Sequence, residues 1–157
     1  MVSLASCTNN QLDVLIECLP NDTVKYEYDS RLGYTVPDSV EGRIRTIQSP
    51  FPNYYGFTES YVSEDGDYLD SFVLSDTCCF ERNAVVPTVI RKLILMTDSG
   101  LEDSKLISST RDYLVTKIDV DNIVGFLCKY SRDSIVIDSI IDVSDIQTVK
   151  KLINEYK

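Results

Sequence analysis

Carboxylates are concentrated in two short stretches of this sequence, each interrupted by a glycine. Three aspartates lie in the first stretch and two in the second: Asp65, Asp67 and Asp70, then Asp98 and Asp103. Carboxylate oxygens are the ligands that hard divalent cations prefer, and Mg²⁺ is usually bound by a few carboxylates, waters and phosphate oxygens. Two carboxylates ~6 Å apart repel each other by about 3 kcal/mol at an effective dielectric constant of ~20, so clustered carboxylates oppose folding unless metal ions or proton uptake compensate. The sequence therefore predicts a magnesium site if the two stretches meet in the fold.

Neither stretch is specific evidence by itself. An isolated Asp-Gly-Asp is more often a surface turn than a metal site. The first stretch is also not an EF-hand, because the position that requires a bidentate Glu is occupied by Asp76. The magnesium interpretation therefore depends on the other residues around these carboxylates.

The charge balance limits the classes of partner. The 157 residues include 15 basic and 25 acidic side chains, which gives a net charge of −10. Such a surface repels polyanions, so we expect no nucleic-acid partner, whereas a small anion can still arrive as a complex with Mg²⁺. A chain of this length is expected to form a single domain, residues 1–157, with a conventional core.

Cysteine and histidine usage argues against a zinc site. The five cysteines show no Cys-x-x-Cys spacing, and the sequence contains no histidine. We expect reduced and mostly buried thiols; a redox role for the adjacent pair Cys78 and Cys79 is the alternative. Residues 1–10 lack a basic leader pattern, and no apolar run is long enough to span a membrane, so the expected location is cytoplasmic, with no membrane partner.

Hydrophobic periodicity predicts an α+β fold that is mainly β. Short alternating segments separated by Gly, Pro, Asn and Asp are typical of a barrel or sandwich. The expected strands are 13–18, 24–28, 34–37, 43–48, 69–74, 85–96 and 105–108. Helical spacing then predicts a helix over 119–130, and a second helix follows a possible capping box formed by Ser144 and Gln147.

The predicted strands also carry basic residues, Lys25, Arg43 and Arg45. Lys25 and Glu27 project from the same face of an extended strand, an arrangement that is usually only a weak surface pair. Arg43 lies in the next segment but one, and Arg45 is an equally good candidate for a phosphate-binding guanidinium.

Three blocks of this sequence, in order, resemble the soluble family I inorganic pyrophosphatases. The blocks are the aromatic segment 50–57, the acidic stretch 64–70, and the segment 96–105, which contains Asp-x-x-x-x-Asp-x-Lys. The similarity extends back to Glu17 and to the Lys25-Tyr26-Glu27 strand, and forward to the aromatic segment that ends at Tyr130. This resemblance implies a small OB-type closed β-barrel flanked by about two α-helices, with the active site at its mouth. It further implies Mg²⁺-dependent hydrolysis of pyrophosphate to two phosphates, by an enzyme that forms a homo-oligomer.

The resemblance also assigns metal ligands and a base. Asp65, Asp70 and Asp103 would hold the metal that activates water, with Asp70 reaching a second ion, and Asp98 and Asp103 would bind the metal that arrives with the substrate. Asp67 would act as the general base. A bridging metal pair suits this reaction because it lowers the pKa of bound water and aligns that water for attack.

Phosphate binding is assigned to cations and hydroxyls on the same grounds. Glu17 and Glu27 would complete the acidic rim or a further metal site. The residues that would contact phosphate oxygens are Lys25, Arg43, Tyr55, Lys105 and Tyr130. A single preorganised donor of this kind is commonly worth about 3 kcal/mol in a transition state.

Four positions depart from the family pattern. Phe51 stands where Tyr is common, Tyr54 replaces Asn, Tyr68 replaces the Pro after Asp-Gly-Asp, and Ser131 follows Tyr130 where the family has Lys. Losing one phosphate contact lowers the rate by about 10²–10³-fold without abolishing metal-assisted attack. Two alternatives therefore stay open: a degenerate relative that binds without turnover, and a hydrolase of another phosphoanhydride such as a nucleotide.

Overall fold

Strands dominate the computed structural model, which describes residues 10–63, 66–76, 80–130 and 134–157. In chain order the elements are β1 (Gln11–Cys18), β2 (Tyr26–Asp29), β3 (Tyr34–Pro37), β4 (Ser39–Val40), β5 (Arg43–Ile44), β6 (Tyr54–Val62), β7 (Tyr68–Leu74), β8 (Val85–Asp98), β9 (Leu101–Glu102), β10 (Lys105–Ser109), α1 (Lys117–Tyr130), β11 (Ile135–Asp142) and α2 (Ile146–Tyr156). No helix within these ranges is long and apolar enough to cross a membrane.

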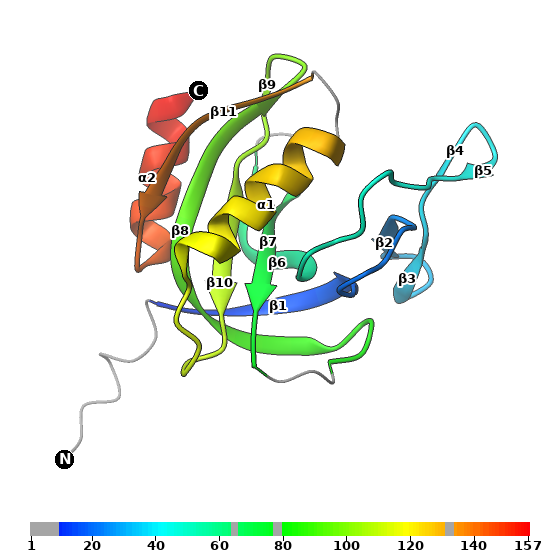
Figure 1. Ribbon diagram of the computed structural model, residues 1–157, viewed down its shortest axis with the longest axis horizontal. Coiled ribbons are helices and arrows are strands. Elements are labelled where there is room, and N and C mark those ends of the chain that lie inside the picture. The colour runs from blue at the N-terminus through cyan, green and yellow to red at the C-terminus, as the bar shows by residue number, and fades with distance from the viewer. Residues whose placement is uncertain (1–9, 64–65, 77–79, 131–133) are drawn as a thin grey trace.

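The main sheet closes on itself. Its strands follow the order β1-β6-β7-β10-β8, and an additional antiparallel pairing of β8 with β1 completes a barrel. All neighbours in this ring are antiparallel except β7 and β10, which run parallel. The second half of the long strand β8 also pairs with β11, which extends the sheet beyond the barrel (Figure 1). The predicted closed, mainly β barrel with two helices is confirmed.

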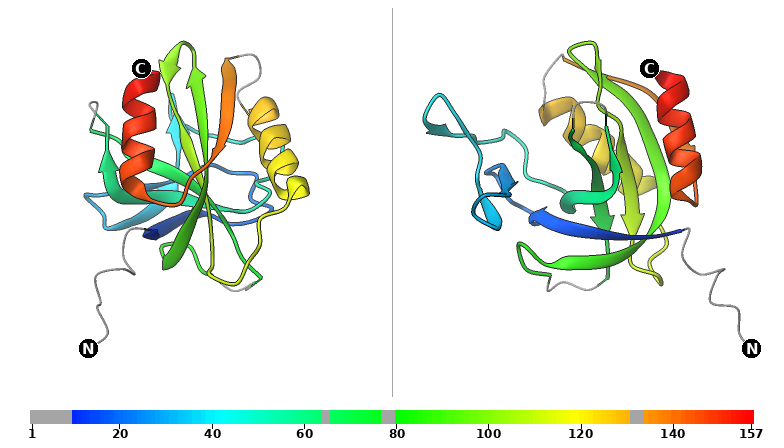
Figure 2. Two further views of the ribbon diagram at one scale, coloured as in Figure 1. Left: turned by 90° about the vertical axis from the view of Figure 1, so that its left-hand side faces the viewer. Right: turned by 180° about the vertical axis from the view of Figure 1, so that it is seen from behind.

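The two helices cover opposite sides of β8 and β11 (Figure 2). Helix α1 buries Ile123, Phe126 and Leu127 in a cluster that includes Phe51 and Phe72 from the barrel side. Helix α2 buries its apolar stripe in a separate cluster, which contains Leu12, Tyr61 and Leu69. Each helix therefore packs its apolar face on a different face of β8, α1 beside Ile94 and Met96 and α2 beside Leu93 and Leu95.

The predicted strands are largely confirmed, but β4, β6, β9 and β11 were not predicted, and one predicted strand ends early. Strand β6 was not predicted: residues 54–58 are all buried, so the alternation that marks a half-exposed strand is absent. The close approach of β6 to β1 is possible only because residue 56 is glycine, since a Cβ there would lie 1.8 Å from the carbonyl oxygen of Leu15. The expected strand 43–48 is wrong beyond Ile44, because β5 pairs only with the two-residue strand β4.

Helix α2 begins one residue later than the expected capping box requires. Its N-cap is Asp145, whose carboxylate accepts hydrogen bonds from the backbone N and the hydroxyl of Thr148. The predicted role of Ser144 as the N-cap is therefore wrong. A carboxylate at this position also interacts favourably with the helix dipole.

Asp145→Ala is expected to lower the free energy of unfolding by about 1 kcal/mol, because it leaves the first-turn amides of α2 without their acceptor. Urea unfolding measures this loss. Ser144→Ala is the matched control and should change stability by less than about 0.5 kcal/mol. The reverse ranking of the two variants would restore Ser144 as the cap.

Two cysteines within the described ranges are free thiols. Cys18 is buried at the end of β1, and Cys128 is exposed on α1. Burial raises the pKa of the Cys18 thiol to about 11, so Cys18 is an inert core residue. Cys128 is an exception to the expected mostly buried thiols, and Cys7, Cys78 and Cys79 lie outside the described residues.

Candidate active site

The parallel pairing of β7 with β10 brings the two acidic stretches together. Lys105 on β10 is the direct register partner of Asp70 on β7. The Lys105 Nζ lies 3.2 Å from a carboxylate oxygen of Asp70 and 3.3 Å from one of Asp103. One ammonium group therefore bridges a carboxylate of the first stretch and a carboxylate of the second, so the two stretches meet as predicted.

These residues line an inner cavity of about 170 Å³, defined by Lys25, Glu27, Arg45, Phe51, Tyr55, Asp70, Phe72, Asp98, Asp103, Lys105, Phe126, Leu127, Tyr130 and Ile135. An outer cavity of about 560 Å³ adjoins it and contributes Glu17, Tyr28, Ser30, Phe57, Glu59, Asp67 and Tyr68. Four side chains belong to both cavities: Lys25, Glu27, Asp70 and Asp103. The cavities therefore form one site with an acidic mouth and an aromatic inner wall.

Most predicted site residues come together here. Asp67 lines the outer cavity, while Tyr55, Asp98, Lys105 and Tyr130 line the inner one. Asp65 and Ser131 lie outside the described residues. The shared face predicted for Lys25 and Glu27 is confirmed, since both side chains line the same two cavities.

Arg43 is the exception among the predicted phosphate-binding residues. It is exposed on β5 and lines neither cavity, whereas Arg45 lines the inner cavity with its guanidinium carbon 4.9 Å from the centre of the Tyr130 ring. Arg45 also lies 3.6 Å from a carboxylate oxygen of Asp38. The expected alternation of side chains along a strand over 43–48 does not apply here, because regular strand pairing stops at Ile44.

Hydrogen bonds fix the centre of the site. The Tyr55 hydroxyl donates to Asp70 at 2.7 Å, and the Lys25 Nζ lies 4.4 Å from the centre of the Tyr55 ring. Glu17 accepts a hydrogen bond of 2.7 Å from the backbone N of Tyr28, which ties β1 to β2. Asp70 thus lies at the junction of Tyr55 and Lys105, and it makes the most side-chain contacts of the site carboxylates that the structure describes.

Burial perturbs the pKa values of several ionisable groups in the site. Burial raises the pKa of Glu17 to about 7, partly offset by Lys25, and burial also raises the pKa values of Asp103 and Glu27. For Lys105, burial opposes the charged form, but the attraction of Asp70 and Asp103 outweighs it and raises the pKa. The carboxylates therefore favour a cation or a proton beside them.

The donor set fits a hard divalent cation. Carboxylates of Asp70 and Asp103 already share one cationic group, the Lys105 ammonium; the sequence contains no His, and no Cys is among the described residues that line the two cavities. Within the described ranges no group of three such side chains is arranged to hold a metal ion directly. A bound ion would therefore take water or substrate oxygens as its remaining ligands, as Mg²⁺ commonly does.

Several lining residues were not assigned to the site from the sequence, among them Glu59, Phe57 and Tyr68. Glu59 adds a carboxylate to the outer cavity, and it was missed because strand β6 was missed. Tyr68 stacks on Phe57 with ring centres 5.3 Å apart and an interplanar angle of 7°. This stack immobilises the residue next to Asp67 where the family pattern has proline.

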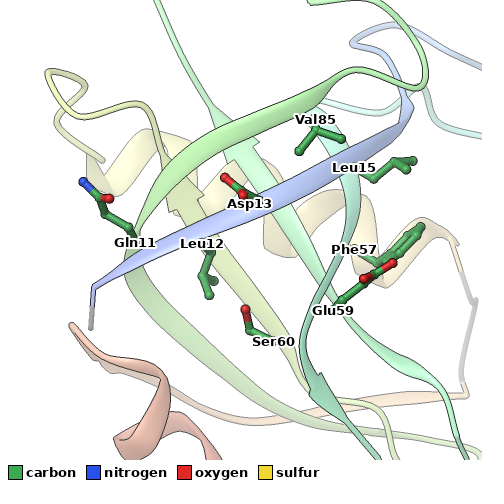
Figure 3. A pocket seen from close by; sticks show the side chains of 8 residues that line it. All are labelled: Gln11, Leu12, Asp13, Leu15, Phe57, Glu59, Ser60 and Val85. Atoms are coloured by element: carbon green, nitrogen blue, oxygen red, sulfur yellow. The ribbon is translucent and has the colours of Figure 1, made fainter. Parts of the chain in front are cut away.

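A different cavity, of about 630 Å³, lies along β1 and β6 (Figure 3). It is lined by Gln11, Leu12, Asp13, Leu15, Phe57, Glu59, Ser60 and Val85. The charged residues of this lining are both acidic, so it lacks the cations that phosphate binding requires. Volume alone therefore does not identify the active site.

Glu17→Gln is expected to stabilise the metal-free protein at pH 8 by about 2 kcal/mol, and at pH 4.5 by less than about 0.5 kcal/mol. The carboxyl titrates near 4.5 when unfolded and near 7 when folded, so the cost of burying its charge is absent below 4.5 and complete above 7. Urea unfolding in EDTA at both pH values measures the difference. Exposed Glu59 supplies the control, Glu59→Gln, and equal gains at the two pH values would contradict the assignment.

Comparisons with known proteins agree with this geometry. The family model described as inorganic pyrophosphatase matches residues 14–124. The chain is 34% identical over 131 residues to the inorganic pyrophosphatase of Mycoplasma pneumoniae, covering 76% of this chain and 67% of that protein. It is 38% identical over 96 residues to that of Mycoplasma genitalium, covering 61% of this chain and only 50% of that protein.

A solved structure of an inorganic pyrophosphatase from Coxiella burnetii is also similar. It superposes with a TM-score of 0.75 at 25% identity, covering 94% of this chain and 96% of that one. The resemblance inferred from the aromatic block and the two acidic stretches is confirmed by a family match that includes all three. The chain belongs to the inorganic pyrophosphatase family.

Proposed function

We propose that this protein hydrolyses inorganic pyrophosphate to two phosphates and that it requires Mg²⁺. Family membership supports a phosphoanhydride hydrolase, as the sequence predicts. The observation that carries the proposal is the Lys105 ammonium bridging Asp70 and Asp103 inside a cavity that also holds Lys25 and Arg45. Carboxylates for metal and cations for phosphate thus share one small space.

Bound Mg²⁺ supplies an acidified water and neutralises charge on the phosphoryl group. The metal would be held by Asp70, Asp98 and Asp103, with Glu17 and Glu27 at the rim. Asp65 retains its proposed ligand role from the family motif. The fit rests on the chemistry of the donor set and on the shared cavity.

The chain's own residues perform the remaining steps. Asp67 accepts the proton of the attacking water at the mouth of the site, where it lines the outer cavity. Lys25, Lys105 and Arg45 donate to phosphate oxygens and stabilise charge that develops on them. Tyr55 and Tyr130 present hydroxyls from the aromatic wall, and burial raises the pKa of both phenols, so they remain donors at neutral pH.

The inner cavity favours a small anion as substrate. Its volume of about 170 Å³ is enclosed by Phe51, Phe72 and Phe126, whose rings pack on one another in the core. These rings are engaged with each other, so they do not offer a free stacking surface for a nucleotide base. Nothing in the described parts of the chain favours the binding-only alternative.

Phosphate release from pyrophosphate, measured with Mg²⁺ and with EDTA, tests the proposal. We expect turnover with Mg²⁺ and none with EDTA. Magnesium and pyrophosphate binding without phosphate release would instead support the degenerate binding protein.

We further propose a single domain, a homo-oligomeric assembly and a cytoplasmic location. Light scattering of the purified protein tests the assembly.

Arg45→Ala is expected to lower kcat/KM by about 10²-fold, because it removes a donor from the phosphate region of the inner cavity. Arg43→Ala is the matched control on the neighbouring exposed strand and should stay within about twofold of the wild type. Steady-state kinetics with magnesium pyrophosphate measure both. A larger loss for Arg43→Ala would return the phosphate-binding role to Arg43.

A further inference from the structure

The segment that carries Lys25 and Glu27 is not part of the barrel sheet. Strand β2 pairs with β3 in a separate two-stranded sheet, which lies beside the barrel at the end of β1 (Figure 1). The backbone N of Lys25 donates a hydrogen bond to the carbonyl oxygen of Arg45, a residue that is also outside the barrel strands. The barrel ladder therefore does not by itself fix where Lys25 and Glu27 stand.

Arg82, in the connection between β7 and β8, contacts β1, the connection that follows β1, and β2. Its Nη1 donates to the carbonyl oxygen of Glu17 at 2.8 Å and to a carboxylate oxygen of Asp22 at 2.7 Å. Its guanidinium carbon lies 3.5 Å from the centre of the Tyr26 ring. A planar guanidinium can form the hydrogen bonds and the stacking contact at once, which an ammonium cannot.

Tyr26 places Arg82 behind the site. Side chains alternate between faces along an extended strand, so Lys25 and Glu27 point away from the face that Tyr26 occupies. Lys25 and Glu27 line the inner and outer cavities, and Arg82 lines neither. Arg82 therefore contacts β2 on the face opposite the one from which Lys25 and Glu27 line the cavities that they share with Asp70.

The base of Arg82 is anchored to the barrel. Asn83 N donates to the carbonyl of Ile16 at 2.8 Å, and Ile16 N donates to the carbonyl of Ala84 at 2.9 Å. The Asn83 side-chain oxygen accepts a 2.6 Å hydrogen bond from Thr35 N on β3. The segment 82–84 is thus fixed on β1 and holds both strands of the small sheet.

We propose that Arg82 is a positioning residue for pyrophosphate hydrolysis, which acts by fixing Lys25 and Glu27 against Asp70. The inference rests on the proposed function and adds a residue outside the cavity to the machinery. Displacing catalytic groups by about 1 Å can cost 10²-fold in rate, so loss of this contact is expected to be visible in kinetics.

Arg82→Met keeps the aliphatic stem and removes the guanidinium. We expect kcat/KM to fall by about 10- to 100-fold at a temperature where the variant remains folded. Arg91→Met is the matched control: Arg91 on β8 is also partly buried and donates to Ser109 and to the carbonyls of Arg111 and Tyr113, away from the site. It should lose stability while kcat/KM changes by no more than about twofold.

A double-mutant cycle separates positioning from general destabilisation. In a Lys25→Met background, Arg82→Met is expected to lower kcat/KM by no more than about threefold, because one of the groups that it positions is already absent. The same fold loss in both backgrounds would overturn the proposal.

Hydrogen exchange gives a readout that needs no turnover. In Arg82→Met, the amides of residues 23–28 should exchange at least about tenfold faster, while those of β7 and β10 keep their rates. Unchanged exchange over 23–28 would overturn the positioning role. A wild-type protein that releases no phosphate would end the proposed function, and the exchange result would still decide whether Arg82 fixes this segment.

Discussion

Asp70→Asn is expected to lower kcat by at least about 10³-fold, the largest kinetic effect of any single change in this site. Asp70 accepts from the Tyr55 hydroxyl, pairs with Lys105 and lines both cavities. The amide keeps the size of the side chain but removes its charge and replaces one acceptor oxygen by a donor. It therefore weakens metal binding and misorients Lys105 in one step.

The measurement is kcat at saturating Mg²⁺, with unfolding by urea as a check that the variant is folded. Asp13→Asn is the matched control, because Asp13 is an exposed carboxylate of β1 in the other cavity (Figure 3). It should leave kcat within about twofold of the wild type. An Asp70→Asn protein within tenfold of wild-type kcat would remove Asp70 from the proposed metal ligands.

Lys105→Met is expected to give the largest loss of stability, about 3 kcal/mol in EDTA. The Lys105 side chain is 8% exposed and neutralises Asp70 and Asp103, which are left without a cation when it is removed. Mg²⁺ should restore most of the loss by supplying a positive charge to the same two carboxylates. The variant should therefore depend on metal for stability far more than the wild type does.

Urea unfolding of the wild type and of Lys105→Met, each with EDTA and with Mg²⁺, gives the four free energies of unfolding for this comparison. Lys92→Met is the matched control, because Lys92 pairs with Asp142, whose side chain is 86% exposed. Such a surface pair contributes about 0.5 kcal/mol or less, with or without Mg²⁺. Equal losses for Lys105→Met in both buffers would show that the carboxylates do not share a cation site.

Local patterns predicted four of the five strands of the closed ring but not β6. Strands β1, β3, β7, β8 and β10 were predicted as short segments between turn residues, and both helices follow apolar stripes. Strand β6 is covered on both faces over 54–58, so its sequence reads as a continuous aromatic block. Pairing partners decide burial, and they are not visible in a local pattern.

The candidate site was predictable where motifs lie on regular strands. Asp70, Lys105 and Tyr55 fall together because β6, β7 and β10 are neighbours. The choice between Arg43 and Arg45 could not be made from the sequence, because the chain leaves regular pairing after Ile44. Arg82 belongs to no recognisable motif. Its contacts with Asp22 and Tyr26 depend on the fold, because these two residues precede Arg82 by 60 and 56 positions in the sequence.

The parallel register of β7 and β10 has a consequence for how activity appears during folding. Asp70 and Lys105 are 35 positions apart, and they become partners only after β8 has crossed the barrel and the chain has returned along β10. A slip of one residue between these strands would turn Lys105 to the opposite face. Non-local contacts of this kind form slowly. After dilution from denaturant, phosphate release therefore returns only in molecules in which β7 and β10 have paired in the correct register. Its recovery lags behind the recovery of the far-ultraviolet circular dichroism signal.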